Sequence, residues 1–452
     1  MNKLNTIQKI YFIGIGGIGM SALARFFHAR GVQVSGYDKT ATPLTKELEQ
    51  TGIAIHYEEN INLIPTDADV VVYTPAIPAA HAELVYYREH GFEVVKRSDV
   101  LQWITEASYN ICVGGTHGKT TVTTMIGHLL RHSGYGCNAF LGGISANYHT
   151  NFWSSERNVV VVEADEYDRS FLKLVPDVAV VTAIDPDHLD IYGTPEAVED
   201  AFIQFSGKVK PGGCLITKKG IHRENEFSAT HHFSYSYNDI RSDIYVSSLT
   251  VQQGSYHFTV RSTQWILENV VLHMGGLHNV ENAVAAIAVA KYLGIEDEKI
   301  KAAIADFKGV RRRFEYAVKN NNHVLIDDYA HHPEELKALI SGVRSIYGEQ
   351  QLTLVFQPHL FSRTQDLADG FARSLDMADE IILLPIYPAR ELPMPGVSSA
   401  MLAERMENKK VALLEKQEMV DRIRNTKPGL VVMAGAGDID ALVGLVKQGL
   451  ES

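Results

Sequence analysis

The sequence has few cysteines, no excess of positive charge and no long apolar run. Its three cysteines, at positions 112, 137 and 214, form no C-x-x-C pair, which fits a reducing compartment better than a disulfide framework. Lysine and arginine number 42 against 54 aspartate and glutamate, a net charge of −12. That balance disfavours nonspecific nucleic-acid binding, because such binding needs clustered cations.

No stretch approaches the roughly 20 apolar residues of a membrane span. The first residues, MNKLNTIQKIYF, also lack the apolar core of a signal peptide. We therefore expect a cytoplasmic protein with no nucleic-acid or membrane partner, present as a monomer or a weak homodimer.

The composition is that of a packed globular protein. The chain has 452 residues, of which 45% are hydrophobic and 21% charged, and its length suggests two to four domains. Short β-like segments alternate with helical patterns over residues 9–105, again from YNICVGG at 109–115, and again after KGVRRRFE at 308–315. This rhythm predicts parallel α/β sheets. Residues 242–273 instead alternate apolar and polar side chains, which is typical of antiparallel strands at a sheet margin.

Two glycine-rich loops follow predicted strands. The first contains G-x-G-x-x-G, formed by Gly14, Gly16 and Gly19, and Asp38 follows at the end of the next strand signal. Glycines allow a tight turn and close backbone approach, and the helix N-terminus attracts a pyrophosphate. Asp38 is placed to accept hydrogen bonds from a ribose. The pattern does not distinguish NAD from another diphosphate such as a UDP-sugar, and a turn that only packs a helix on a sheet is the structural alternative.

The second loop, GGTHGKTT, predicts an ATP site. Lys119 can contact the β- and γ-phosphates of a nucleotide, and the Thr120 hydroxyl can bind Mg²⁺. The spacing departs from G-x-x-x-x-G-K-[ST], because the position five before Gly118 is Val113. The preceding strand and following helix nevertheless give the context that a phosphate loop needs.

Acidic residues and histidines follow later strands. Glu163 comes directly after the apolar run VVVV, where a carboxylate can hold the metal that bridges the phosphates. His188 lies between Asp187 and Asp190, and a role at a second metal competes with a purely structural one. The segments GVRRRFE, DDYAHHPEE and FQPHLFSRT offer further arginines and histidines at strand ends, with charged surface turns as the alternative.

Taken together, these motifs resemble the ATP-dependent Mur ligases of peptidoglycan synthesis. The segments that carry the resemblance, in chain order, are GIGGIGMSALA, GTHGKTT, VVEADEYD, DPDHLD, HNVENA, GVRRRFE, DDYAHHPEE and FQPHLFSRT. The first of these is similar to the loop of the member that adds L-alanine to UDP-N-acetylmuramate. The resemblance implies ATP and Mg²⁺ as cofactors, and an acyl phosphate formed on the lactyl carboxylate of the sugar.

The resemblance also implies three domains: a Rossmann-like UDP-sugar domain at residues 1–107, a central P-loop ATPase domain at 108–314 and a Rossmann-like closing domain at 315–452. The residues implied at the ATP site are Gly115, Thr116, His117, Gly118, Lys119, Thr120, Thr121, Asn279, Asn282, Arg313, Asp328 and His331. Those implied at the UDP-sugar site are Gly14, Gly16, Gly17, Gly19, Met20, Ser21, Asp38, His359 and Arg363. Thr120, Glu163 and His188 are the implied metal ligands, and Lys119 and His188 the implied catalytic residues.

Two other functions remain open from the sequence. A related ligase attaches a whole peptide to the same sugar nucleotide during wall recycling. A nicotinamide-dependent oxidoreductase would use Gly14, Gly16, Gly19 and Asp38, but it leaves Lys119 without a role. One departure from the family pattern is Leu360, where some relatives carry a basic residue after the histidine of FQPH.

Overall fold

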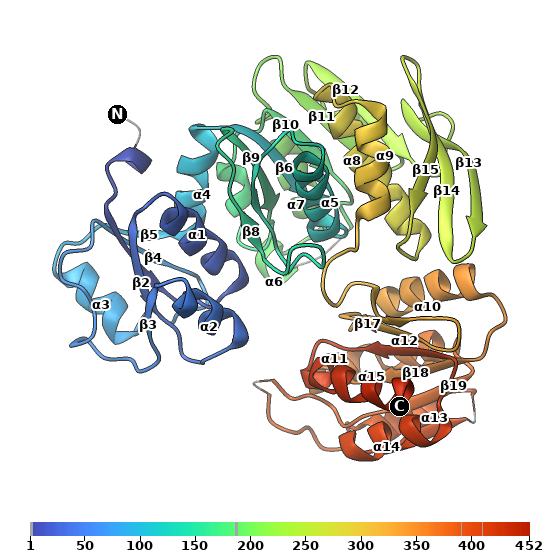
Figure 1. Cartoon of the computed structure of the whole chain (residues 1–452). Helices are drawn as coiled ribbons and strands as arrows, with labels where there is room; N and C mark the ends of the chain where they lie inside the picture. The colour runs from blue at the N-terminus through green and yellow to red at the C-terminus, as the bar shows by residue number, and fades with distance from the viewer. Residues whose placement is uncertain (1–2, 186–188, 390, 409) are drawn as a thin grey trace. The chain divides into compact units, whose positions relative to one another are not determined.

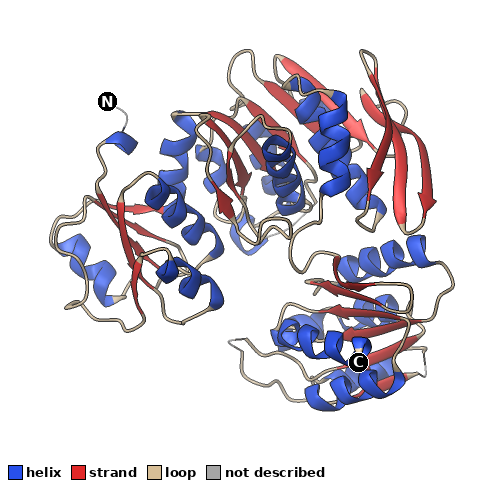
Figure 2. Ribbon diagram, in the orientation of Figure 1, coloured by secondary structure: helices blue, strands red, loops and turns tan. Residues whose placement is uncertain are grey.

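The computed structural model describes residues 3–185, 189–389, 391–408 and 410–452, which form an α/β protein with three sheets (Figure 1). The chain divides into two compact units. Unit 1 comprises Met1–Leu249, Phe258–Val270 and Glu281–Phe307, and unit 2 comprises Thr250–His257, Val271–Val280 and Lys308–Ser452. Helices flank the strands of each sheet (Figure 2). Within the described residues, no helix is both long and apolar enough to cross a bilayer.

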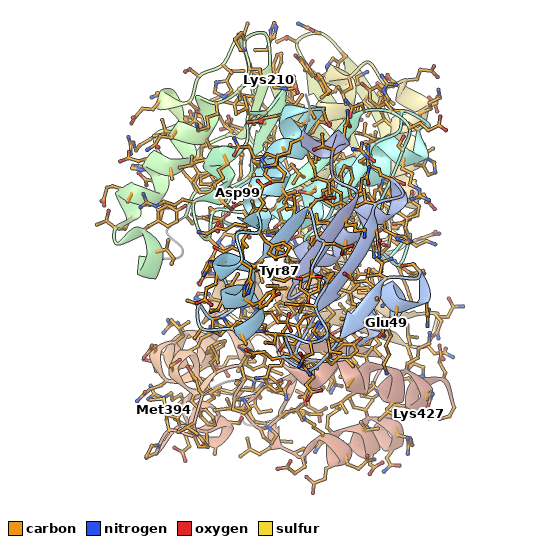
Figure 3. All side chains as sticks on the ribbon, turned by 90° about the vertical axis from the view of Figure 1, so that its left-hand side faces the viewer. Glu49, Tyr87, Asp99, Lys210, Met394 and Lys427 are labelled. Atoms are coloured by element: carbon orange, nitrogen blue, oxygen red, sulfur yellow. The ribbon has the colours of Figure 1, made fainter. Side chains whose placement is uncertain are left out.

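The first sheet has five parallel strands in the order β3-β2-β1-β4-β5. Apart from Lys9 at the start of β1, its central strands β1 and β4 are apolar, and most of their residues are buried, as parallel strands covered by helices require. Tyr87, labelled in Figure 3, lies in the core on one face of this sheet. The elements are β1 (Lys9–Ile13), α1 (Ile18–Ala29), β2 (Gln33–Tyr37), α2 (Pro43–Gln50), β3 (Ala54–His56), β4 (Val70–Tyr73), α3 (Ala82–Glu89), β5 (Val94–Lys96) and α4 (Arg97–Glu106).

The second sheet has ten strands in the order β15-β14-β13-β12-β11-β10-β6-β9-β7-β8. The strands from β13 to β7 pair in parallel, and β8 pairs antiparallel with β7. Short turns join β13, β14 and β15 into the antiparallel margin. The strands are β6 (Tyr109–Gly114), β7 (Asn138–Phe140), β8 (Phe152–Trp153), β9 (Val159–Ala164), β10 (Val178–Val181), β11 (Cys214–Lys218), β12 (His231–Ser236), β13 (Ile244–Gln252), β14 (Ser255–Ser262) and β15 (Ile266–Leu272). The helices are α5 (Lys119–His132), α6 (Leu189–Tyr192), α7 (Pro195–Ser206), α8 (Leu277–Tyr292) and α9 (Asp297–Asp306).

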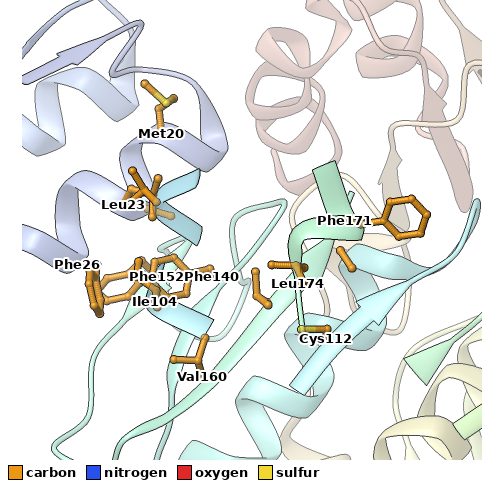
Figure 4. Packing of buried hydrophobic residues seen from close by; sticks show 14 of the residues in the cluster. Met20, Leu23, Phe26, Ile104, Cys112, Phe140, Phe152, Val160, Phe171 and Leu174 are labelled. Atoms are coloured by element: carbon orange, nitrogen blue, oxygen red, sulfur yellow. The ribbon is translucent and has the colours of Figure 1, made fainter. Parts of the chain in front are cut away.

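The first two sheets share one hydrophobic core inside unit 1. Phe26 of α1 packs on Phe140 of β7 with ring centroids 5.3 Å apart, and Phe140 packs on Phe152 of β8 at 5.0 Å (Figure 4). An ion pair between Lys173 and Asp99, which Figure 3 labels, adds a polar contact between the same two parts. Each of the two aromatic pairs contributes about 0.5–1.5 kcal/mol to stability beyond simple burial. The two sheets are therefore held together by packing as well as by the chain.

Unit 2 is built on a six-stranded sheet in the order β16-β17-β21-β18-β19-β20. Only β16 runs antiparallel, against β17, among the pairs described for this sheet. The strands are β16 (Glu315–Lys319), β17 (Val324–Asp328), β18 (Leu352–Phe356), β19 (Glu380–Leu383), β20 (Val411–Leu413) and β21 (Leu430–Ala434). The helices are α10 (Pro333–Tyr347), α11 (Phe361–Asp366), α12 (Ala368–Leu375), α13 (Ser399–Arg405), α14 (Lys416–Thr426) and α15 (Val443–Glu451).

The predicted fold class is confirmed, including the antiparallel margin of the second sheet. The sequence did not predict the short strands β7 and β8 at the opposite edge of that sheet. All three cysteines are buried free thiols, which agrees with the absence of a disulfide framework. Burial raises the pKa of the Cys137 and Cys214 thiols to about 12.

Candidate active site

The second glycine loop joins the end of β6 to the start of α5, as its sequence predicts. Gly115 and Gly118 have φ angles of +137° and +82°, which lie in the region that favours glycine. A Cβ on Gly115 would also overlap the Thr182 hydroxyl at the end of β10. The Thr182 hydroxyl donates to the backbone oxygen of His117. The loop is thus fixed against the neighbouring strand, with Lys119 as the first residue of the helix.

Lys119 is held by two acceptors. Its Nζ donates to the Gly115 carbonyl oxygen and to Glu166 Oε1, each at 2.7 Å. Glu166 is only 1% exposed. Burial raises the pKa of this carboxyl, and the nearby Lys119 ammonium opposes that shift. The lysine predicted to bind phosphate is therefore paired with a buried carboxylate.

Thr120 and Glu163 meet where α5 starts and β9 ends. The Thr120 hydroxyl lies 3.1 and 3.0 Å from the two Glu163 carboxylate oxygens. A Cβ on Gly142 would overlap Glu163 Oε2, so this glycine leaves the space that the carboxylate occupies. Hydroxyl and carboxylate oxygens are the ligands that Mg²⁺ prefers, and they fit such an ion here. The described residues hold no group of three or more acidic, histidine or cysteine side chains arranged to bind a metal.

The other residues predicted around the second loop lie at different depths. Thr116 and Thr121 are buried, and the Thr116 hydroxyl accepts from the backbone N–H of Asp185 at 3.1 Å. His117 is exposed. Asn282 of α8 points its Oδ1 at Gly118, since a Cβ there would come within 3.1 Å of that oxygen.

Two further predicted residues are Asn279 and His188. Asn279 is buried in the first turn of α8, and its side-chain amide donates to the Gly275 carbonyl at 2.6 Å. This is a local bond from the side chain to the backbone four residues earlier. His188, predicted as a metal ligand and catalytic residue, lies outside the described residues.

The first glycine loop turns sharply after β1. The backbone N–H groups of Gly14 and Ile15 both donate to the Tyr37 carbonyl of β2. The Gly16 N–H donates to Asp38 Oδ2 at 2.8 Å, and a Cβ on Gly16 would lie at the same distance from that oxygen. The other Asp38 oxygen accepts from the Thr40 N–H at 3.1 Å. Asp38, predicted to accept from a ribose, thus holds the loop itself.

The residues after this turn start α1. Gly17 precedes the helix, and a Cβ on Gly19 would overlap the guanidinium of Arg97. Met20 and Ser21 are buried. The Ser21 hydroxyl accepts from Asn151 Nδ2 at 2.8 Å, and the same amide donates to the Ile18 carbonyl. The loop is therefore also tied to the second sheet.

Unit 2 gathers polar side chains at the carboxyl ends of β17 and β18. Asp328 accepts from the backbone N–H groups of Phe314 and Ala330, each at 2.7 Å. Burial raises the pKa of Asp328 to about 6, although these two bonds oppose the shift. Arg313 is exposed in the preceding segment. Such strand ends are where open α/β sheets bind ligands.

Three predicted residues of unit 2 lie side by side. The rings of His331 and His359 are 6.1 Å apart, and Arg363 Nη1 lies 3.4 Å from His359 Nδ1. Burial lowers the pKa of both histidines. Tyr387 stacks on His359 with an interplanar angle of 14°. Residues from DDYAHHPEE and FQPHLFSRT, nearly 30 positions apart along the chain, therefore form one surface.

Sequence reasoning missed three residues that shape these sites, Arg97, Thr182 and Tyr387, and the pairing of a fourth, Glu166. Glu166 was visible in the acidic run EADEYD, but nothing in the sequence showed that it pairs with Lys119. The other three follow strands or start helices without a motif of their own, so only the folded chain reveals them.

Comparison with known proteins decides the family. The family model described as Mur ligase middle domain matches residues 113–290, the one described as Mur ligase family, catalytic domain, matches 9–109, and the one described as Mur ligase, glutamate ligase domain, matches 312–437. This chain belongs to the Mur ligase family. These three matches follow the order of the three sheets along the chain.

Two curated relatives carry the same name. The chain is 48% identical to the UDP-N-acetylmuramate–L-alanine ligase of Porphyromonas gingivalis, over 99% of this chain and 100% of the relative. It is 47% identical to the ligase of the same name from Parabacteroides distasonis, over 98% of both chains.

Solved Mur ligase structures share the fold. The UDP-N-acetylmuramate–alanine ligase of Thermotoga maritima superposes with a TM-score of 0.82 at 26% identity, covering 98% of this chain and 99% of that one. A murein peptide ligase of Psychrobacter arcticus gives a TM-score of 0.67 at 22% identity, covering 98% of each chain. At this lower identity the likeness concerns the fold alone. The chain is an ATP-dependent ligase that forms amide bonds.

Proposed function

We propose that this ligase joins L-alanine to the lactyl carboxylate of UDP-N-acetylmuramate at the expense of ATP. The observation that carries the proposal is the cluster of Lys119, Thr120 and Glu163 at one phosphate loop, in a chain 48% identical to a relative of that name. A carboxylate and an amine do not condense in neutral water, so the carboxylate first needs a leaving group. Attack of the lactyl carboxylate on the γ-phosphate gives an acyl phosphate and ADP, and attack by the amine then releases phosphate.

The residues of the second loop fit the phosphoryl-transfer step. Negative charge gathers on the phosphate oxygens, and the Lys119 ammonium is placed on the loop where it can neutralise part of it. Thr120 and Glu163 would hold a magnesium ion, which would supply further positive charge and fix the phosphates when bound. Asn282 lies beside the same loop and is proposed to contact the nucleotide.

The first glycine loop is proposed to bind the diphosphate of the UDP-sugar. Asp38 occupies the Gly16 N–H and the Gly14 carbonyl accepts from the Gly17 N–H, so the amide of Gly19 in the first turn of α1 is the proposed donor. His359 and Arg363 are proposed to meet the same substrate, and Asp328 and His331 the nucleotide, all from the domain proposed at residues 315–452. Arg313, just before that domain, is also proposed to meet the nucleotide.

Two experiments test the proposal. Lys119→Ala should lower ADP formation with ATP, Mg²⁺, L-alanine and UDP-N-acetylmuramate by about two to three orders of magnitude, the size expected when a transition-state charge partner is lost. Lys208→Ala removes an exposed lysine of the same unit and should leave the rate unchanged. ADP formation near the wild-type rate in Lys119→Ala would refute the assignment.

The second candidate is the recycling ligase that adds a whole peptide, because a murein peptide ligase shares the fold. A panel of amino acids and the tripeptide, with ADP release as the readout, separates the two. L-alanine should give the highest kcat/KM. A preference for the tripeptide would assign the chain to recycling. Membership of a ligase family leaves the oxidoreductase alternative without support.

A further inference from the structure

The ammonium of Lys119 is bound to a carboxylate that the phosphate chemistry does not require. A lysine has three N–H donors, and here one meets Glu166 Oε1 and another the Gly115 carbonyl. Glu166 is 1% exposed, and a buried carboxylate is costly unless a cation or donors compensate it. The structure therefore contains a cation site beside the phosphate loop, with the lysine as its present occupant.

The position of Glu166 is fixed by its own backbone. Its carbonyl oxygen accepts from the Arg169 N–H at 2.9 Å and from the Tyr192 hydroxyl at 2.7 Å. The preceding turn is closed by Asp165, whose Oδ1 accepts from the Tyr167 N–H at 3.1 Å. Because the loop is held at several points, we expect Glu166 to stay in place when Lys119 moves.

The proposed reaction needs a cation at the same place in its second half. When Lys119 turns to the phosphates, Glu166 loses the ammonium that now offsets its charge. The incoming amino acid carries an α-ammonium, the same chemical group as the end of the lysine side chain. That ammonium must come close to the acyl carbon, which forms next to the γ-phosphate, and it must lose a proton before it can attack.

We propose that Glu166 binds the α-ammonium of the incoming amino acid once Lys119 has turned to the nucleotide, and that it accepts the proton that activates the amine. The inference rests on the proposed function and extends it to the amino-acid subsite. It also orders the reaction, because the amino acid gains its binding partner only after the nucleotide has drawn Lys119 away.

The proton and bond balance is complete without a further reactant. The Glu166 carboxylate takes one proton from the ammonium, which leaves a neutral amine and a carboxylic acid. The amine nitrogen then bonds to the acyl carbon, and the bond between that carbon and the phosphate oxygen breaks. The second N–H proton leaves with the phosphate as hydrogen phosphate, and Glu166 returns its proton to solvent after product release.

The test compares L-alanine with hydroxylamine as nucleophile in Glu166→Gln. Hydroxylamine is largely unprotonated at neutral pH, so it needs neither the carboxylate as a counter-ion nor a base to remove a proton. In the variant we expect the kcat/KM for L-alanine to fall roughly 100-fold, the size typical of a lost general base. Hydroxamate formation from hydroxylamine, ATP and UDP-N-acetylmuramate should remain within about twofold of wild type, a difference well below 1 kcal/mol.

Each other outcome overturns the proposal. An equal loss with both nucleophiles would mean that Glu166 serves phosphoryl transfer through Lys119, and an unchanged kcat/KM for L-alanine would mean that it does neither. Absence of ADP release from the wild-type protein with every nucleophile would instead refute the proposed function, so the two failures are distinguishable.

Two further variants and one binding measurement serve as controls. Asp168→Asn removes a negative charge from the same loop, and its amide oxygen can still accept from the Ser170 N–H as Asp168 does; it should behave as wild type. Glu166→Asp keeps the charge but shortens the side chain. It should retain more activity with L-alanine than Glu166→Gln, which tests the proposal even if Glu166→Gln folds poorly. Affinity for a fluorescent ATP analogue should stay equal or rise in Glu166→Gln, because Lys119 is no longer held back. A weaker affinity would contradict the exchange of partners.

Discussion

At the scale of single residues, Glu163 keeps its place because residue 142 has no side chain. A Cβ there would overlap Glu163 Oε2 and lie 2.7 Å from the carboxyl carbon. Residue 142 belongs to a loop that no phosphate-loop motif includes, yet it decides whether a proposed metal ligand can reach Thr120.

Gly142→Ala should therefore weaken the binding of magnesium. We expect the Mg²⁺ concentration for half-maximal ADP formation to rise about tenfold, which corresponds to about 1.4 kcal/mol. Gly207→Ala is the control, because a Cβ there meets no atom closer than 3.5 Å. An unchanged Mg²⁺ titration in Gly142→Ala would show that Glu163 is not a metal ligand.

Asp38 offers a second test at this scale, because it holds the first loop through Gly16 and Thr40. Asp38→Ala removes both bonds, and we expect the KM for UDP-N-acetylmuramate to rise about tenfold from the loss of one to two charge-assisted bonds. The KM for ATP should stay constant in Asp38→Ala. It should also stay constant in the control Asp67→Ala, which changes an exposed residue. Equal effects on both substrates would indicate general destabilisation instead.

The sequence predicted the loops of the site better than the bonds within them. Glycine spacing and the Gly-Lys-Thr run located both turns, because backbone conformation at a turn depends on local residues. The bond between Gly16 and Asp38, the burial of Ser21 against Asn151 and the pairing of Lys119 with Glu166 join residues 22 to 130 positions apart. No local pattern encodes such contacts.

At the scale of elements, His128 joins α5 to α9. Its Nε2 lies 2.9 Å from the Ala303 carbonyl, which can only accept, so Nε2 carries a proton. Nδ1 lies 3.0 Å from the Tyr148 hydroxyl, which donates to it. The ring is fully buried and neutral, and burial lowers its pKa from 6.5 to about 4.

This pKa shift predicts how stability depends on pH. Between pH 6.5 and about 4 the unfolded chain binds a proton at His128 that the folded chain does not. The contribution to stability is therefore complete above pH 6.5 and declines as the pH falls, by about 3 kcal/mol in all. We expect the free energy of unfolding, from denaturant melts at several pH values, to fall with pH in wild type by this amount more than in His128→Gln. His132→Gln, on the exposed side of the same helix, should keep the wild-type slope.

The sequence predicted the long elements well and the short ones poorly. The apolar run VVVV before Glu163 forms strand β9, the run VAVV forms β10 and an alanine-rich segment forms α8. The three-residue β7 and two-residue β8 are too short to show a hydrophobic period. They form because the parallel β9 offers an edge and Phe26 offers a surface to pack against.

At the scale of the whole molecule, each sheet was predictable as a layer, but the shared core of the first two was not. Phe26, Phe140 and Phe152 come from three separate elements of unit 1. Phe152→Ala should lower the hydrogen-exchange protection of both β1 and β9, by about 3–5 kcal/mol each. Phe258→Ala, at the antiparallel margin, should lower protection near β14 and leave β1 unchanged. A loss confined to β9 would show that the first sheet is stable alone.

The three buried thiols make the chain suited to site-specific labelling. Cys112, Cys137 and Cys214 are at most 1% exposed, and burial keeps them in the unreactive protonated form. A maleimide dye should therefore not react with the native protein. One cysteine introduced at an exposed position in each unit would give a fluorophore pair free of background. Energy transfer between the two dyes would then report in real time whether nucleotide and amino acid change the separation of the units.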